Sequence, residues 1–196
     1  MSLPKPKKVN VERYIGGLSK LKKNNHSIKL SANESALGPS PKAIKALEID
    51  NEKVSKYPES DSNLLRQVIS EKFNIDSGKI ICGSGSDQIF DLTCKLFLES
   101  GDEVIVTEFG FIMHRIYAAI HGAKILLAKE KNYKASVNEI LAKVNEKTKI
   151  VFIANPNNPT GTYLSKSEMV DLRNKLRSDI LLVVDDAYFE FLNKDD

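Results

Sequence analysis

The stretch that decides the fold runs from residue 149 to residue 162 and reads KIVFIANPNNPTGT. It opens with a continuous apolar run, which is typical of a strand in a sheet covered on both faces. It ends in a loop with two prolines, three asparagines and a glycine. A turn needs only one or two such residues. The surplus of amide and hydroxyl groups therefore raises the question of what this loop binds.

On both sides of this stretch, apolar strands alternate with amphipathic helices from residue 40 onward. The predicted strands are KIICG (79–83), EVIVT (103–107), AKILLA (123–128), KIVFIA (149–154) and the start of ILLVVDDAYFEF (180–191). Helices are predicted after Pro41, after residue 62, after residue 86, at 112–120, at 137–144 and after a Ser165/Glu168 capping box. The class is therefore α/β, with a mostly parallel central sheet flanked by helices. Residues 1–39 do not follow this pattern and are predicted to form an N-terminal arm.

The composition is that of a globular protein with a sizeable core. The chain has 196 residues, 41% of them hydrophobic and 28% charged, and a formal charge of +3. A charge this small predicts no nucleic-acid partner, although the N-terminal arm is locally basic. No apolar run reaches membrane-spanning length, so no membrane association is expected. Cys82 and Cys94 lack metal-site spacing and are predicted to be reduced packing residues, which suits a cytoplasmic protein.

A second polar cluster, GSGSDQ (83–88), lies between a predicted strand and a predicted helix. The start of a helix presents free backbone N–H groups and a positive dipole end, which suits a phosphate group. The cluster is not a dinucleotide fingerprint, because Gln88 stands where a third glycine is needed, and it lacks the ending of a P-loop. An ordinary strand-to-helix turn explains it about as well.

A third cluster, VVDDAYFEF (183–191), places Asp185 at the end of a buried strand. A carboxylate there is costly without a partner, which is either a metal ion or the protonated ring nitrogen of a cofactor. The alternative is that Asp185 or Asp186 caps the next segment. Tyr188 points into the same pocket or packs, and Phe111 is placed to cover a ring face. Taken together, the three clusters predict a site for a small phosphorylated aromatic cofactor at the carboxyl ends of the strands.

Six motifs in order along the chain resemble the fold type I aminotransferases that use pyridoxal 5'-phosphate. They are YIGG (14–17), LSANESALGPSP (30–41), YPES (57–60), GSGSDQ (83–88), NPNNPTGT (155–162) and VVDDAYFEF (183–191). The second and third motifs resemble most the branch that acts on histidinol phosphate. The resemblance implies an incomplete large domain of this fold. Residues 1–39 would be an arm and part of the small domain, and residues 40–196 part of the large cofactor-binding domain.

The resemblance also implies a role for each residue that matches a family motif. Asp185 would pair with the protonated pyridine nitrogen, and Asn158 and Tyr188 would bond to the ring oxygen. Phe111 would stack on the ring. The phosphate would be held mainly by backbone N–H groups of Gly85, Ser86 and Asp87. Tyr57 would reach the phosphate of the cofactor in the partner subunit. Tyr14 and Asn33 would line the substrate side of the site.

The implied reaction moves an amino group between L-histidinol phosphate and 2-oxoglutarate in histidine biosynthesis, within a cytoplasmic homodimer. Two departures from the family pattern stand out. His114 lies where the family often has tyrosine, and it is expected to be a surface or packing residue. The Schiff-base lysine is absent, since nothing around Lys194 matches its motif. The chain is therefore expected to be the N-terminal portion of the enzyme and inactive by itself.

Three alternatives remain open at the level of sequence. Within the enzyme class, the parent protein is an aromatic-amino-acid aminotransferase or an amino-acid-phosphate decarboxylase, because these share the cofactor residues. Outside it, the chain is a non-catalytic module that holds the cofactor or a nucleotide without a covalent bond. Titration with the cofactor distinguishes covalent from reversible binding.

Overall fold

The structure is a computed structural model, and it describes residues 9–11, 14, 16, 31–48 and 55–192. The chain divides into two compact units. We call them the helical unit, residues 14–82, and the sheet unit, residues 83–196 together with residues 1–13. The division into domains at residue 39, which the sequence predicts for the whole protein, stays a prediction.

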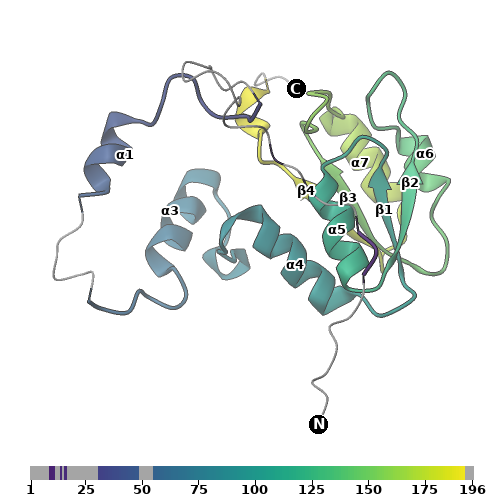
Figure 1. The fold of residues 1–196 in the computed structure, drawn as a ribbon, viewed down its shortest axis with the longest axis horizontal. Coiled ribbons are helices and arrows are strands. Elements are labelled where there is room, and N and C mark those ends of the chain that lie inside the picture. The colour runs from purple at the N-terminus through teal and green to yellow at the C-terminus, as the bar shows by residue number, and fades with distance from the viewer. Residues whose placement is uncertain (1–8, 12–13, 15, 17–30, 49–54, 193–196) are drawn as a thin grey trace, which may run out of the picture. The chain divides into compact units, whose positions relative to one another are not determined.

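The core of the sheet unit is a parallel sheet of four strands in the order β2-β1-β3-β4 (Figure 1). The strands are β1 (Glu103–Thr107), β2 (Lys124–Ala128), β3 (Thr148–Ala154) and β4 (Leu181–Asp185). Ile105 of β1 lies opposite both Leu126 and Val151 in the ladders. Because all described strand pairs are parallel, the predicted fold class is confirmed, with four of the five predicted strands in place.

The fifth predicted strand, at residues 79–83, is wrong. Residues Ser77–Lys79 form a short 3-10 turn, η1, in which the Asp76 side chain accepts a hydrogen bond from the Gly78 N–H. Ile80 has extended backbone angles, and Ile81 is 75% exposed. Apolar residues form a strand only beside a neighbour that takes up their backbone groups, and no described strand pairs with these residues.

Helices cover both faces of the sheet, as the continuous apolar strands predict. On one face lie α4 (Gly85–Phe97) and α5 (Ile112–Ile120), packed on Val104, Val106, Ile150 and Phe152. On the other face lie α6 (Val137–Leu141) and α7 (Lys166–Lys175), packed on Ile105, Val151 and Ile153. Successive residues of β1 and β3 thus alternate between two separate clusters of the core.

Local sequence signals explain where the best-defined helices begin. The predicted capping box of α7 is present, since Ser165 accepts a hydrogen bond from the Glu168 N–H and Glu168 from the Ser165 N–H. The helical unit contains α1 (Pro41–Ala46), which follows Ser40 with proline in its first turn as predicted. Ser40 itself makes no side-chain cap bond. The unit also contains α3 (Asn63–Phe73), which buries none of its residues.

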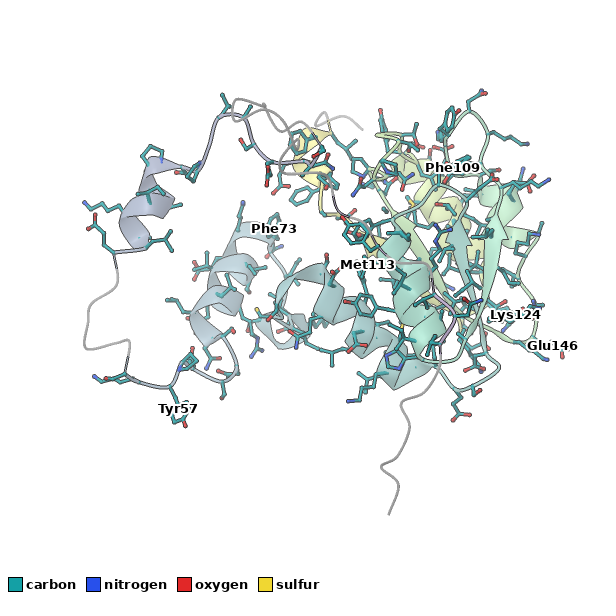
Figure 2. The ribbon with its side chains drawn as sticks, in the orientation of Figure 1. Tyr57, Phe73, Phe109, Met113, Lys124 and Glu146 are labelled. Atoms are coloured by element: carbon teal, nitrogen blue, oxygen red, sulfur yellow. The ribbon has the colours of Figure 1, made fainter. Side chains whose placement is uncertain are left out.

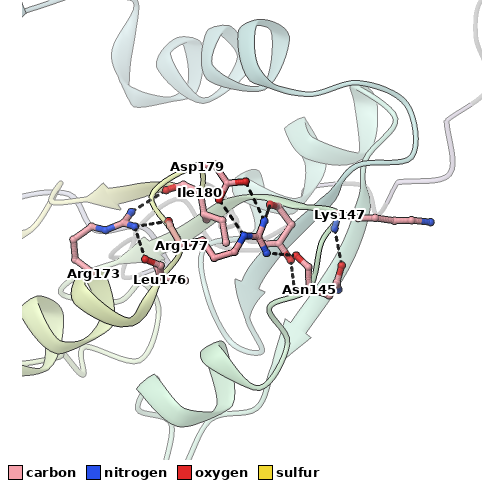
Figure 3. A network of polar contacts seen from close by, with 8 residues as sticks. Asn145, Lys147, Arg173, Leu176, Arg177, Asp179 and Ile180 are labelled. Carbon is pink, nitrogen blue, oxygen red and sulfur yellow. Dashed lines mark hydrogen bonds and ion pairs between the residues drawn. The ribbon is translucent and has the colours of Figure 1, made fainter.

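Two arginines fasten the amino-terminal edge of the sheet (Figure 3). The Arg173 guanidinium donates to the carbonyl oxygens of Leu176, Arg177 and Ile180, at the turn between α7 and β4. Arg177 donates to the Asn145 carbonyl at 2.6 Å and pairs with Asp179 at 3.0 Å. This network ties the start of β4 to the start of β3, and it lies away from the loops that carry the predicted site.

Two further observations concern the described residues as a whole. None of the described helices is long and apolar enough to cross a membrane. Both cysteines are free, and burial together with nearby Asp91 raises the pKa of the Cys94 thiol to about 12. Cys94 is therefore an inert packing residue at neutral pH, as the sequence predicts.

Candidate functional site

The carboxyl ends of β1, β3 and β4 bring three of the predicted loops together. The Asn155 N–H donates to the Asp185 carbonyl oxygen at 3.0 Å, which joins the loop after β3 to the end of β4. The Asn157 side chain donates to the Phe109 carbonyl at 3.2 Å, which joins the same loop to the turn after β1. Figure 2 shows Phe109 at this end of the sheet unit, with Lys124 and Glu146 toward the other end.

Asp185 is the last residue of β4, and its carboxylate is nearly buried, with a side-chain exposure of 9%. The sequence predicts that such a group needs a cation or a strong donor. Part of that need is met inside the chain. His114 Nε2 lies 3.2 Å from Asp185 Oδ2, and the Ala187 N–H donates to Oδ1 at 3.2 Å. The carboxylate is thus held in one orientation at the strand end.

Of the two expectations for His114, a surface or a packing residue, the packing one is confirmed, because the residue is 1% exposed. It stacks on Phe152, with ring centroids 5.1 Å apart and planes 13° apart. Phe90 and Phe111 meet it edge-on, at 4.7 Å and 5.7 Å between centroids. His114 therefore packs, but it also supports the site. The signal in the sequence is the three-residue spacing from Phe111, which places both at the start of one helix and on one side of it.

The surplus of polar groups in NPNNPTGT divides into two uses. Asn155 satisfies the loop itself, since its side chain donates to the Leu164 carbonyl and accepts from the Leu164 N–H. Asn157 donates to Thr160 Oγ1 at 2.8 Å as well as to Phe109. The half-buried Asn158 has no side-chain hydrogen bond to any described residue. Asn158 is therefore the amide in this loop that a ligand can engage.

The predicted phosphate site lies at the start of α4. Gly85 has a φ of +77°, and its N–H donates to the Gly83 carbonyl at 2.9 Å. The Ser84 N–H is taken up by the Gln88 side chain at 2.6 Å. Gly85 thus shapes the turn rather than offering its own N–H. The first helical turn leaves the N–H groups of Ser86 and Asp87 without partners inside the helix, so these two can meet an anion.

The turn after β1 places Phe111 at the N-cap of α5. The Gly110 N–H donates to the Thr107 carbonyl at 3.1 Å. A Cβ at position 110 would lie 2.6 Å from Thr107 Oγ1, closer than any real contact. The turn therefore requires glycine. This turn sets the backbone position of the half-buried Phe111.

Beyond β4, the chain turns through Asp186 and Tyr188 into the short 3-10 helix η2 (Phe189–Phe191). Burial and the neighbouring Asp185 raise the pKa of the Asp186 carboxyl. Tyr188 is half-buried, and its ring centroid lies 6.3 Å from that of Phe191. Tyr188 lies three residues beyond Asp185, and its predicted role at the ring oxygen stays a prediction.

The remaining predicted residues lie in the helical unit. Tyr57 is fully exposed, Tyr14 is 54% exposed, and Asn33 is exposed. Their predicted roles stay predictions. No group of three or more His, Cys, Asp or Glu residues in the described part of the chain could hold a metal ion.

The arrangement of the sheet unit fits a particular kind of ligand. It offers a held carboxylate, an unengaged amide, a half-buried aromatic ring and the start of a 13-residue helix. A carboxylate favours a cationic ring nitrogen, and a helix start favours a phosphate. The residues present therefore fit a phosphorylated, protonated heteroaromatic ring.

Comparison with curated proteins points the same way. The chain is 56% identical over all 196 residues to a histidinol-phosphate aminotransferase of Pelagibacter ubique, covering 54% of that protein. It is 44% identical over 193 residues to the histidinol-phosphate aminotransferase of Paramagnetospirillum magneticum, covering 98% of this chain and 53% of that protein. The chain thus spans about half the length of the curated relatives it matches.

Solved structures share the fold. A histidinol-phosphate aminotransferase from Sinorhizobium meliloti, in complex with pyridoxal-5'-phosphate, matches with a TM-score of 0.80 and 27% identity, over 84% of this chain and 45% of that one. An aromatic aminotransferase from Pyrococcus horikoshii matches with a TM-score of 0.73 and 25% identity, over 81% of this chain and 46% of that one.

The broadest comparison is with protein families. Residues 25–196 match the family described as aminotransferase class I and II. This match includes all three loops at the carboxyl edge of the sheet, together with the start of α4. The chain belongs to the class I and II aminotransferase family.

Proposed function

We propose that this chain supplies the cofactor-holding part of an aminotransferase that uses pyridoxal 5'-phosphate. The observation that carries the proposal is the Asp185 carboxylate, held by His114 at the end of β4, beside the loop that carries Asn158. When bound, the cofactor ring would supply an electron sink for proton loss from the substrate. Asp185 would keep the ring nitrogen protonated, since a nearly buried anion favours a cation.

The other residues would orient the ring. Asn158 and Tyr188 would donate to the ring oxygen, and Phe111 would lie on one face of the ring. Ser86 and Asp87 would hold the phosphate through their N–H groups, with Gly85 shaping the turn. Asp185 comes from the end of β4 and Ser86 and Asp87 from the start of α4, whereas Asn158, Phe111 and Tyr188 come from the turns that follow three strands of the sheet.

For the whole protein, we propose transfer of an amino group between L-histidinol phosphate and 2-oxoglutarate, in histidine biosynthesis in the cytoplasm. The first substrate is supported by the names of the relatives, which are 56% and 44% identical to the chain. We further propose a homodimer, in which Tyr57 reaches the partner's phosphate and Tyr14 and Asn33 line the substrate.

A binding titration tests the cofactor assignment. Pyridoxamine 5'-phosphate needs no covalent bond to the protein, so it reports the held groups directly. Asp185→Ala should weaken its binding, whereas binding of inorganic phosphate should stay unchanged. The 196-residue chain should show no transamination of histidinol phosphate. If the chain binds neither ligand, the cofactor assignment fails.

A growth test addresses the substrate. The complete coding region that contains this chain should restore growth of a histidine auxotroph that lacks histidinol-phosphate aminotransferase. Restoration of growth only on an aromatic-amino-acid auxotroph would favour the aromatic branch instead.

A further inference from the structure

We infer that Asn157 is a positioning residue that fixes the turn carrying Phe111 relative to the loop carrying Asn158. The inference rests on the proposed function, in which those two side chains hold the ring face and the ring oxygen. Asn157 is buried, with 7% exposure. Its Nδ2 donates to the Phe109 carbonyl at 3.2 Å, two residues before Phe111.

A chain of hydroxyl groups sets the orientation of the Asn157 amide. Thr162 Oγ1 donates its proton to the Tyr133 carbonyl at 2.6 Å. Thr160 Oγ1 lies 2.9 Å from Thr162 Oγ1 and must therefore be the donor in that pair. Because a hydroxyl has one proton, Thr160 can only accept from Asn157, whose Nδ2 lies 2.8 Å away. The chain thus runs in one direction, from Asn157 to Tyr133.

This direction determines where the Asn157 oxygen lies. A flipped amide would set Oδ1 against two acceptors, the Phe109 carbonyl and a Thr160 hydroxyl without a spare proton. The observed orientation avoids that repulsion, but it leaves Oδ1 buried without a hydrogen-bond partner among the described residues. A buried acceptor of this kind costs stability. The amide thus joins two loops through its Nδ2 group while its Oδ1 atom lacks a hydrogen bond. Such a local departure from good hydrogen bonding is typical of a functional position.

Backbone hydrogen bonds within the loop couple the position of Asn157 to that of Asn158. The Asn157 N–H donates to the Thr162 carbonyl, and the Asn157 carbonyl accepts from the Gly161 N–H, both at 2.8 Å. Asn157 and Asn158 therefore belong to one closed loop. A movement of Asn157 away from Phe109 would shift Asn158 relative to Phe111.

Binding of two ligands, pyridoxamine 5'-phosphate and inorganic phosphate, distinguishes a positioning role of Asn157 from a general effect on stability. Asn157→Leu keeps a similar volume and removes both donated bonds. It should weaken binding of pyridoxamine 5'-phosphate about 10- to 100-fold, the loss seen at metal sites when a residue that supports a ligating side chain is removed. Binding of inorganic phosphate should not change, because Asn157 makes no bond to the start of α4. Both constants are measured by isothermal titration calorimetry.

Two further variants sharpen the test. Thr162→Val removes the hydroxyl that accepts from Thr160 and leaves the Asn157 side chain unaltered. The Thr160 hydroxyl can then turn its proton toward Asn157, so the orientation of the Asn157 amide is no longer fixed. This variant should weaken pyridoxamine 5'-phosphate binding in the same direction, but less. Asn174→Leu makes the matched change on the exposed face of α7, and it should leave both ligands unaffected.

The outcomes distinguish a positioning role of Asn157 from a merely structural one. Unchanged binding of pyridoxamine 5'-phosphate by Asn157→Leu overturns the inference. An equal loss of both ligands, with a lower melting temperature, also overturns it, because it shows a merely structural role. Failure of the unaltered chain to bind either ligand overturns the proposed function, and the inference with it.

Discussion

At the scale of single residues, Asp185 and Asn158 are the side chains proposed to meet the cofactor ring, and each has a neighbour that holds it in place, His114 for Asp185 and Asn157 for Asn158. Asp185 is recognisable because a carboxylate at a strand end needs a partner, whereas Asn158 is distinguished from the other asparagines of its loop only by the family resemblance. The sequence marks His114 only by its spacing from Phe111, which does not reveal its contact with Asp185, and it does not mark Asn157 at all. Their contacts join positions far apart in the chain, and spacing along a sequence does not reveal such contacts.

One residue-scale prediction concerns His114. Replacing it with phenylalanine keeps the aromatic packing but leaves Asp185 Oδ2 with one donor fewer. The free energy of unfolding should fall by about 1–3 kcal/mol, the usual cost of an unsatisfied buried group. Urea unfolding measures this loss. His114→Tyr is the matched control, since a hydroxyl there can donate to the carboxylate, and equal stability of the Phe variant and the unaltered chain would contradict the prediction.

A second residue-scale prediction concerns Gly110. Gly110→Ala forces a methyl group to within 2.6 Å of Thr107 Oγ1. We expect a loss of about 1–3 kcal/mol, as for overpacking elsewhere. Thr107→Ala, combined with Gly110→Ala, should recover part of that loss because the clashing oxygen is gone. A double-mutant cycle in urea measures the recovery, and strictly additive losses would show that the clash is not the cause.

At the scale of elements, helices were predictable where local signals agree with the hydrophobic period. Residues 112–120 form a helix as predicted, and the capping box of α7 stands where Ser165 and Glu168 place it. The strand predicted at residues 79–83 failed because a strand is completed by a neighbour, and its own residues do not supply one. A helix forms its backbone hydrogen bonds within its own segment, so its own sequence predicts it more reliably than a strand's does.

An element-scale prediction follows from the start of α7. Hydrogen bonds from Ser165, and then from Lys134, lower the pKa of Glu168 from 4.5. A lowered carboxyl pKa contributes stability above the unfolded value, and that contribution is lost as pH falls through the folded value. Glu168→Gln should therefore be less stable than the unaltered chain at pH 7, by roughly 0.5–1 kcal/mol for an exposed pair and cap.

The pH dependence is the decisive readout for Glu168. The difference in melting temperature between the two chains should shrink as the pH falls from 4.5 through the lowered folded pKa of Glu168, since the carboxyl is neutral in both states only below that folded value. Asp171→Asn, one turn further along the same helix, is the control for a surface charge outside the cap. A difference that persists unchanged at pH 3 would rule out the charge of Glu168 as the cause.

At the scale of the whole molecule, composition indicated a core of ordinary size, but it did not show how unevenly that core is distributed. The sheet unit holds both buried clusters. In the helical unit, α1 and α3 bury no residue, and Leu64 and Val68 remain 73% and 52% exposed. Exposed apolar helix faces of this kind favour association.

We therefore expect the 196-residue chain to self-associate in solution. Val68→Lys, on the exposed face of α3, should raise the monomer fraction in gel filtration without lowering the melting temperature of the sheet unit. Ile150→Lys, in the core beneath α4 and α5, should instead abolish cooperative melting. A sharp monomer peak for the unaltered chain would argue against association.

The contact between His114 and Asp185 has a consequence for the order of folding. The two residues lie 71 positions apart, and they meet only after β4 has joined the edge of the sheet. Contacts between such distant positions carry a large loop-closure entropy, so they tend to form late. Changes at this pair should therefore speed unfolding while leaving the refolding rate nearly unchanged. During synthesis on the ribosome, the carboxylate would reach its histidine only once β4 has emerged.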